Sequence, residues 1–186
     1  MGLAPRMNTL TTNVITGGGS DSGGSTSIFL ITWGPTYTHC IYPKGSKAGL
    51  SVRDLGEVTL EDANNGRYQG YRTHYKWDVG LCVRDWRYNI RVPNIDVSAL
   101  EEIPSSGSDL IKLMIEMIHA LPNPDVAGKI FYVNSTISTY LDLQTLSSSN
   151  MNVTYRDDPH GRRIMFFRGV PVKQCDAILS TEATVS

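Results

Sequence analysis

The chain has 186 residues, of which 40% are hydrophobic and 17 are glycine. This length and apolar content fit about one globular domain and exclude a disordered chain or a large multidomain machine. Only 19% of the residues are charged and the formal net charge is −1, so there is no global field to attract nucleic acid or an anionic membrane, and a charge-poor surface favours association.

The first predicted element is a mobile Gly/Ser loop at residues 16–27, because this composition is entropically costly to order. Two β-rich runs follow, at 28–33 and 37–42, and the Gly34-Pro35 turn between them predicts a hairpin. A short strand at 57–60 then leads to Asn65-Gly66, a dipeptide typical of a tight reversal.

A long extended segment begins at Tyr71. Its odd positions are mostly apolar as far as Val83, which predicts a strand with one buried face. Beyond Val83 the apolar residues fall on even positions, so we expect a β-bulge or a bend near Arg84-Asp85, with the ring of Trp86 in the core. More than twenty extended residues imply an elongated protein or an interrupted sheet.

The second half predicts a small α/β lobe. Ser106-x-x-Asp109 offers a cap for a helix at 110–121, and this helix is apolar on nearly all sides, which suits packing on its own sheet or, as the less favoured alternative, on a neighbouring subunit. A buried strand at 130–133 comes next. Ser135 then offers a cap for a second helix to about Leu146, with Ile137, Tyr140, Leu141 and Leu146 expected to face inward. Strands at 152–155 and 164–167, and a β-rich tail, complete the order.

No constellation of catalytic or metal-binding residues is evident. Cys40, Cys82 and Cys175 lack disulfide or zinc spacing, which favours reduced thiols. No apolar run could span a membrane and no signal peptide is present, so we expect folding in the cytoplasm. Two weaker alternatives are a cation at the polar tip formed by Asp157, Asp158 and His160, and a hydrolase site around His119 or His160.

Basic residues alternate with aromatic rings around position 86. A nucleic-acid-binding module that uses Arg84, Arg87 and Arg91 is therefore one interpretation. The slightly negative net charge and the nearby acids favour a different one, in which this polar strand face forms ion pairs between subunits.

Several blocks in a fixed order resemble the major capsid proteins of tailed bacteriophages. They are IYPKGSKAGL (41–50), DLG (54–56), GRYQGY (66–71), YKWDVGLCVRDWRY (75–88), IFYVN (130–134), FRGVPV (167–172) and CDAIL (175–179). The resemblance covers nearly the whole chain. It implies the Hong Kong 97-type capsid fold, an α+β fold with an elongated, antiparallel β-rich peripheral domain and a small α/β axial domain.

On this resemblance, residues 1–103 correspond to the peripheral domain, 104–168 to the axial domain, and 169–186 to a return into the peripheral domain. The chain then corresponds to the C-terminal portion of a longer family member. The family's N-terminal arm, extended β loop and long spine helix would precede it, and the helix-poor first half departs from the family pattern.

The resemblance further implies a structural virion protein of a bacteriophage or prophage, either a major capsid (head) subunit or a fragment of one. Such a subunit self-assembles into hexameric and pentameric capsomers of an icosahedral shell around double-stranded DNA, with weak, non-specific DNA contact. No enzymatic activity, cofactor or membrane contact is expected. The residues that we predict to define the fold or the subunit interface are Trp77, Arg84, Asp85, Trp86, Arg87 and Tyr88.

Overall fold

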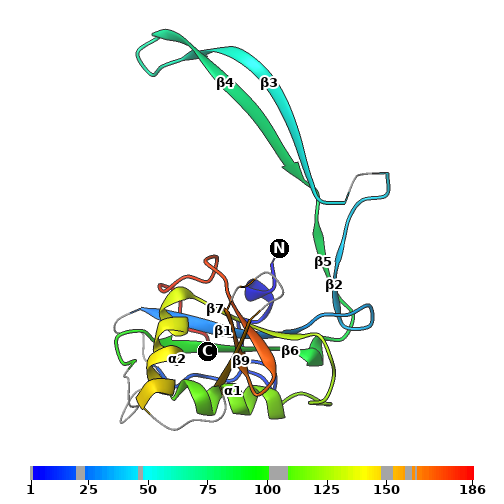
Figure 1. Cartoon of the computed structure of the whole chain (residues 1–186), viewed down its shortest axis with the longest axis vertical. Coiled ribbons are helices and arrows are strands. Elements are labelled where there is room, and N and C mark those ends of the chain that lie inside the picture. Colours follow the sequence, from blue (N-terminus) through cyan, green and yellow to red (C-terminus); the bar gives the residue numbers. More distant parts are fainter. Residues whose placement is uncertain are drawn as a thin grey trace. The chain divides into compact units, whose positions relative to one another are not determined.

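A computed structural model describes residues 2–19, 24–45, 48–100, 109–147, 153–157, 161 and 163–186 (Figure 1). The chain forms two compact units. The first consists of 1–38 and 83–186, and the second is His39–Cys82. No helix among the described residues is both long enough and apolar enough to cross a membrane.

The first unit is built on a six-stranded sheet with the order β6-β1-β7-β10-β9-β8. Neighbouring strands are antiparallel except for β7 and β10, which are parallel. In chain order the strands are β1 (Ser25–Thr32), β6 (Asn89–Asp96), β7 (Lys129–Val133), β8 (Val153–Asp157), β9 (Arg163–Phe167) and β10 (Val170–Gln174). A single-turn 3-10 helix, η1 (Ala4–Arg6), precedes them.

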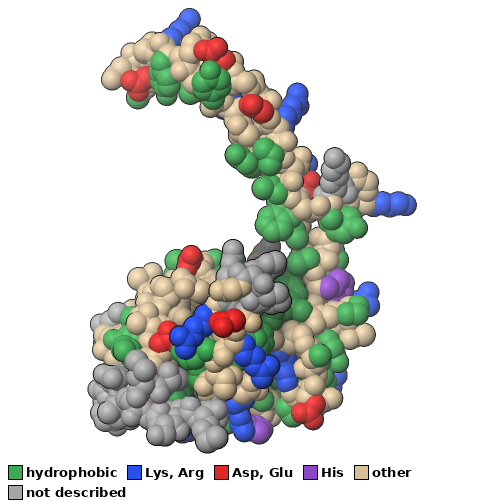
Figure 2. Space-filling view, viewed as in Figure 1, with side chains coloured by type: hydrophobic (Ala, Val, Ile, Leu, Met, Phe, Trp, Pro, Cys, Tyr) green, Lys and Arg blue, Asp and Glu red, His purple; other side chains and the backbone are tan. Residues whose placement is uncertain are grey.

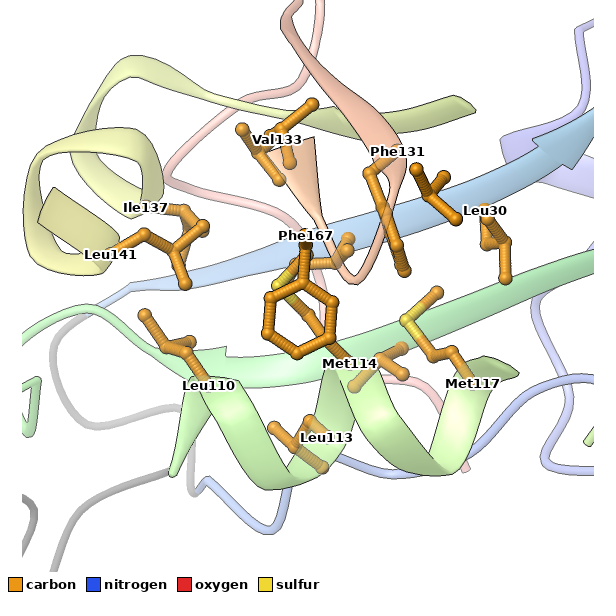
Figure 3. Close-up of a cluster of buried hydrophobic side chains, with 14 of the residues drawn as sticks. Leu30, Leu110, Leu113, Met114, Met117, Phe131, Val133, Ile137, Leu141 and Phe167 are labelled. Atoms are coloured by element: carbon orange, nitrogen blue, oxygen red, sulfur yellow. The ribbon is translucent and has the colours of Figure 1, made fainter. Parts of the chain in front are cut away.

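Two helices, α1 (Leu110–His119) and α2 (Ser135–Ser147), pack against this sheet. Figure 3 shows side chains of both helices meeting those of the strands in one apolar cluster. Phe131 and Phe167 lie edge to face in it, with ring centroids 5.9 Å apart. Each of these rings is fully buried, so this cluster supplies most of the hydrophobic free energy of the unit.

The helix predicted at 110–121 is confirmed to within two residues. Its cap is Asp109, whose carboxylate accepts hydrogen bonds from the backbone N–H groups of Ile111 and Lys112, both at 3.1 Å; Ser106 lies outside the described residues. Met114 and Met117 are fully buried. The favoured packing of this helix on its own sheet is therefore correct.

The second predicted helix is also confirmed, although its cap differs by one residue. Asn134, rather than Ser135, accepts the bond from the N–H of Ile137, at 2.8 Å. Ile137 and Leu141 are buried as expected, and the side chain of Leu146 lies outside the described residues. The strand at 130–133 is confirmed as β7, and those at 152–155 and 164–167 as β8 and β9.

The predicted hairpin of runs 28–33 and 37–42 is wrong. The first run is β1, both of whose edges are occupied, by β6 on one side and β7 on the other. The second run gives β2 (Thr38–Ile41), which pairs with β5 (Gly80–Val83). A turn does form between the two runs, since the N–H of Gly34 donates to the carbonyl of Thr38 at 3.0 Å. The two strands nevertheless do not pair with each other, because each pairs with strands that are distant in the sequence.

The mobile loop predicted at 16–27 is wrong for its described residues. The N–H groups of Gly17 and Gly19 bond the carbonyls of Pro93 and Asn94, each at 2.8 Å. A Cβ on Gly19 would stand 2.6 Å from the backbone nitrogen of Asp96, so glycine serves close approach to β6 here rather than flexibility. Ser25–Ser27 belong to β1 and are buried; residues 20–23 lie outside the described part.

The C-terminal tail lies against the first strands of this unit. Glu182 donates its N–H to the carbonyl of Ser25 at 2.8 Å, and the side chain of Asn94 exchanges two hydrogen bonds with the backbone of Val185, at 2.7 and 2.8 Å. The strands of the predicted α/β lobe and those of the first half thus share one sheet. The domain boundaries at 103 and 168 come from the family resemblance and stay a prediction.

The second unit contains the β2–β5 pair and a hairpin of β3 (Leu50–Glu61) and β4 (Arg67–Trp77). The predicted reversal is confirmed: Asp62 and Gly66 are bonded across the turn at 2.8 Å, and Asn65 has a φ of 62°. The expected break near Arg84-Asp85 is also present, because β5 ends at Val83 and a 3-10 turn, η2 (Trp86–Tyr88), follows.

Candidate assembly surface

The second unit has no core of its own. None of its described residues, 39–45 and 48–82, is buried. The prediction of one buried face from Tyr71 onward is therefore wrong within this chain: Tyr71 is 86% exposed, and Tyr75 and Trp77 are each 63% exposed. The alternating pattern is real, but β4 has only β3 beside it, and an isolated hairpin is marginally stable in water.

The register of the hairpin places its apolar residues on two different faces. Near the base, Leu50 is opposite Trp77 and Val52 is opposite Tyr75, so these four side chains share one face. Near the turn, Leu60 is opposite Tyr68. This second pair belongs to the other face, because the strand contains an irregularity between the two halves.

That irregularity is a β-bulge. Asp54 pairs with Thr73 and Glu57 with Tyr71, so that Leu55 and Gly56 together oppose a single residue. Gly56 adopts a φ of 69°, and its N–H is bonded to the carboxylate of Asp54 at 2.9 Å. The bulge transfers the apolar positions of β3 to the opposite face of the ribbon.

The direction in which each face of the hairpin points changes along its length. A two-stranded ribbon is strongly twisted, so a face that points one way at the base points elsewhere near the turn. Figure 2 shows the result: the hydrophobic side chains of the hairpin gather along one of its sides from base to turn. We use the name apolar stripe for the apolar residues at paired positions on both faces of the hairpin, which are Leu50, Val52, Val58, Leu60, Tyr68, Tyr71, Tyr75 and Trp77.

One predicted site residue, Trp77, belongs to the stripe. It also lines a shallow pocket of about 490 Å³ together with Tyr42, Pro43 and Val79. Sequence reasoning missed the β3 members, Leu50 and Val52, because charged and glycine residues soon follow them. The alternation of Leu50 and Val52 with polar neighbours was the signal available.

The other predicted residues, Arg84 to Tyr88, lie in and next to η2. The carboxylate of Asp85 caps the turn by accepting the N–H of Arg87 at 3.1 Å, and it also accepts two bonds from the guanidinium, at 3.0 and 2.8 Å. The side-chain bond from Arg87 is the main cause that lowers the pKa of Asp85, and the same bond raises the pKa of Arg87. This ion pair lies within one chain, not between subunits.

Trp86 and Tyr88 have different surroundings. Trp86 is 64% exposed, so the prediction that its ring lies in the core is wrong; it sits in the 3-10 turn, where the alternation of a strand no longer applies. Tyr88 is half-buried, and its ring lies 4.5 Å from that of Tyr37. Arg84 is exposed, and its backbone N–H bonds the carbonyl of Tyr37 at 2.8 Å.

Arg91 is unavailable to a nucleic acid. Its side chain is buried, and its guanidinium donates to Ser27 at 3.1 Å, to the carbonyls of Ala4 and Met7 at 3.2 and 2.6 Å, and to Glu182 at 2.9 Å. Because Arg87 is also committed to Asp85, the three arginines do not form a common basic face. Nothing here supports the nucleic-acid-binding interpretation.

Within the part of the chain that the structure describes, no group of three or more His, Cys, Asp or Glu side chains could hold a metal ion. Asp158 and His160 of the alternative cation site lie outside this part. His119 is an exposed residue at the end of α1. Cys40, Cys82 and Cys175 are all free thiols.

Comparison with known proteins identifies the family. The family model described as major capsid protein GP7 matches residues 1–186. A chain in the near-atomic-resolution cryo-EM structure of bacteriophage Epsilon15 is 31% identical, with a TM-score of 0.61, and the match covers 100% of this chain and 58% of that one. A comparison with curated proteins finds no match. The chain thus spans little more than half of this solved relative, and with a family match over its whole length it belongs to the major capsid protein GP7 family.

Proposed function

We propose that the chain is a structural subunit of a bacteriophage head, and that copies of it are held together through the β3–β4 hairpin. The observation that carries this proposal is the absence of any buried side chain among the described residues of His39–Cys82. Six of the eight stripe residues are exposed, and Val58 and Leu60 are half-buried, so together they form an apolar surface that is costly to leave in water. A neighbouring copy that covers it supplies the missing second layer.

Family membership supports this reading. The proposed assembly follows the family: capsomers of five or six copies in an icosahedral shell around double-stranded DNA. The proposal assigns residues 1–103 and 169–186 to the peripheral domain and residues 104–168 to the axial domain. It also assigns Trp77 and the segment from Arg84 to Tyr88 to subunit interfaces.

Other parts of the proposal concern partners and chemistry. The chain would act with the N-terminal region that longer family members carry, fold in the host cytoplasm before entering the virion, and touch packaged DNA only weakly. It would perform no catalysis, because the family to which it belongs is that of a capsid protein, which has a structural role. The apolar stripe is a surface for protein contact, not a pocket for a substrate.

Self-association of the purified chain tests the proposal. We expect sedimentation velocity and negative-stain imaging to show rings or larger particles that grow with protein concentration. Leu50→Ser combined with Trp77→Ser removes two stripe residues and should shift the assembly threshold to higher concentration, by about tenfold or more. Leu179→Ser is the matched control, because Leu179 is as exposed as Leu50, at 58% against 59%, and lies outside the hairpin. A chain that remains monomeric at every concentration contradicts the proposal.

A further inference from the structure

The two faces of the β3–β4 ribbon differ in charge. Successive side chains of a strand point to opposite faces, so the register of the hairpin assigns each side chain to one of them. One face holds all the acids of the paired positions, Asp54, Glu57 and Glu61, together with one cation, Arg67. Within residues 50–61 and 67–77 the other face holds no acid, and its basic residues are Arg53, Arg72, His74 and Lys76.

These basic residues gather at one end of their face, near the start of β3. We call this end the cationic patch; it consists of Ser51, Arg53, Arg72, His74 and Lys76, all of which are exposed. The reverse of the same segment carries the apolar side chains of Leu50, Val52, Tyr75 and Trp77. A neighbouring copy that packs on the apolar side therefore leaves the cationic patch facing away from that contact.

The charge of the patch is only partly neutralised within the chain. Among the residues that the structure describes, neither Arg53 nor Arg72 forms a salt bridge. Lys76 pairs with Asp78 at 2.9 Å. Asp54 follows Arg53 in sequence but lies on the other face, and its carboxylate accepts a backbone N–H at 2.9 Å. Like charges on one face of a ribbon repel each other, so an anion bound to the patch would stabilise the hairpin.

The composition of the patch fits a phosphate backbone better than a protein partner. The centre of a protein–protein interface is apolar and poor in charge, whereas none of the patch residues is apolar. Interfaces with nucleic acid are more polar and more positive. Guanidinium groups form paired hydrogen bonds with phosphate oxygens, and serine hydroxyls add further contacts to the backbone. Both kinds of donor are present, since Ser51 and Arg53 share this face of β3.

We infer that the cationic patch binds the phosphate backbone of double-stranded DNA, with Arg53 and Arg72 as its main contacts. The inference rests on the proposed function, which supplies the DNA. This end of the ribbon then has two roles, because its apolar side joins copies of the protein and its basic side holds DNA. Phosphate contacts carry no sequence information, so binding is independent of base sequence. The patch is distinct from Arg84, Arg87 and Arg91, which form no common basic face.

A salt titration of DNA binding tests the inference. Binding of the full chain to a short labelled duplex is measured by fluorescence anisotropy. At low salt, Arg53→Gln with Arg72→Gln should weaken binding about tenfold. The slope of log affinity against log salt concentration should become shallower by about 1.8, because each lost phosphate contact removes about 0.9. Arg53→Lys with Arg72→Lys keeps both charges and should retain most of the slope.

The matched control removes the same total charge elsewhere. Arg67→Gln with Arg84→Gln changes two exposed positions outside the patch and should leave the affinity within about twofold. If the two glutamine pairs weaken binding equally, DNA responds to net charge and the inference is wrong. Self-association of the Arg53→Gln, Arg72→Gln chain should match that of the wild type, because these positions lie on the face opposite Leu50 and Trp77, and this serves as the control for an intact hairpin.

An acidic protein segment is the alternative occupant of the patch, and poly-L-glutamate is the probe for it. DNA carries one charge per roughly 1.7 Å of its axis, against roughly 3.3 Å per residue of an extended polypeptide. We therefore expect the full chain to bind the duplex more tightly than poly-L-glutamate at equal concentration of charge. Equal binding, lost in both cases with Arg53→Gln and Arg72→Gln, would show that the patch docks acidic protein and that the DNA assignment is wrong.

The outcomes separate this inference from the proposed function. If copies assemble but the wild type binds no duplex at low salt, or binds it unchanged after Arg53→Gln with Arg72→Gln, the inference is wrong and the proposed function stands. If the chain binds the duplex through the patch and yet remains monomeric at every concentration, the assembly proposal is wrong and the DNA contact stands. Neither binding nor assembly would overturn both.

Discussion

At the scale of single residues, Arg91 connects parts of the first unit that are far apart in sequence. Its guanidinium reaches the N-terminal segment through the carbonyls of Ala4 and Met7, and the C-terminal tail through Glu182. It also lies 5.4 Å from the centre of the Phe29 ring. Sequence patterns suggested a surface cation here, because nothing local indicates that both termini fold over this strand.

Removing this buried cation should be expensive. Arg91→Met leaves the carboxylate of Glu182 without its guanidinium partner and frees the carbonyls that anchor residues 4–7. We expect a loss of about 3–5 kcal/mol in the free energy of unfolding, measured by urea denaturation. Arg84→Ala, at an exposed position, should change it by less than about 0.5 kcal/mol. Equal effects of the two substitutions would show that the Arg91 network is not a major contributor.

At the scale of secondary-structure elements, local signals were sufficient for the helices and insufficient for strand pairing. Asp109 and the apolar run after it identify α1, because a cap and a helical face are both written in neighbouring residues. By contrast, β1 pairs with β6, more than fifty residues later, and not with the nearby β2. The turn residues Gly34-Pro35 could not reveal that β6 and β7 occupy both edges of β1.

The η2 turn gives a prediction on pH. The pKa of Asp85 is lowered by its hydrogen bonds with Arg87, so the carboxylate stabilises the turn at pH values above the usual aspartate range, and this contribution is lost as the pH falls through the depressed pKa. In an NMR titration, Arg87→Gln should raise the Asp85 midpoint toward its ordinary value. Arg84→Gln should leave the midpoint unchanged. If Arg87→Gln also left it unchanged, the hydrogen bond from Arg87 would not be the cause of the lowered pKa of Asp85.

At the scale of the whole molecule, the sequence allowed the family, the α+β class and most elements to be predicted, but not which surfaces remain uncovered. The alternation from Tyr71 to Trp77 predicts a buried face, but these side chains are exposed in this chain. It cannot tell whether the covering layer belongs to the same chain. The switch of faces at Gly56 was equally hidden, because a bulge depends on the register of two strands.

The division into two units predicts that the first folds without the second. The carbonyl of Tyr37 and the N–H of Arg84 are 2.8 Å apart, so the two ends of the second unit meet at one point of the first. Replacing His39–Cys82 with a short Gly/Ser turn should therefore leave the melting temperature of the first unit within a few degrees of the full chain, because a shorter loop costs less entropy to close. The same replacement should abolish self-association; an unfolded product would show that the units are interdependent.

A ribbon without an interior cannot be stabilised by the chain that carries it alone. Binding of a neighbouring copy would favour the ordered hairpin by mass action. In dilute solution the loss of conformational entropy opposes ordering of the hairpin, and at high protein concentration association offsets this loss. Under the proposed function, neighbouring copies complete the structure of the subunit, and protein concentration becomes one of the variables that determine its fold.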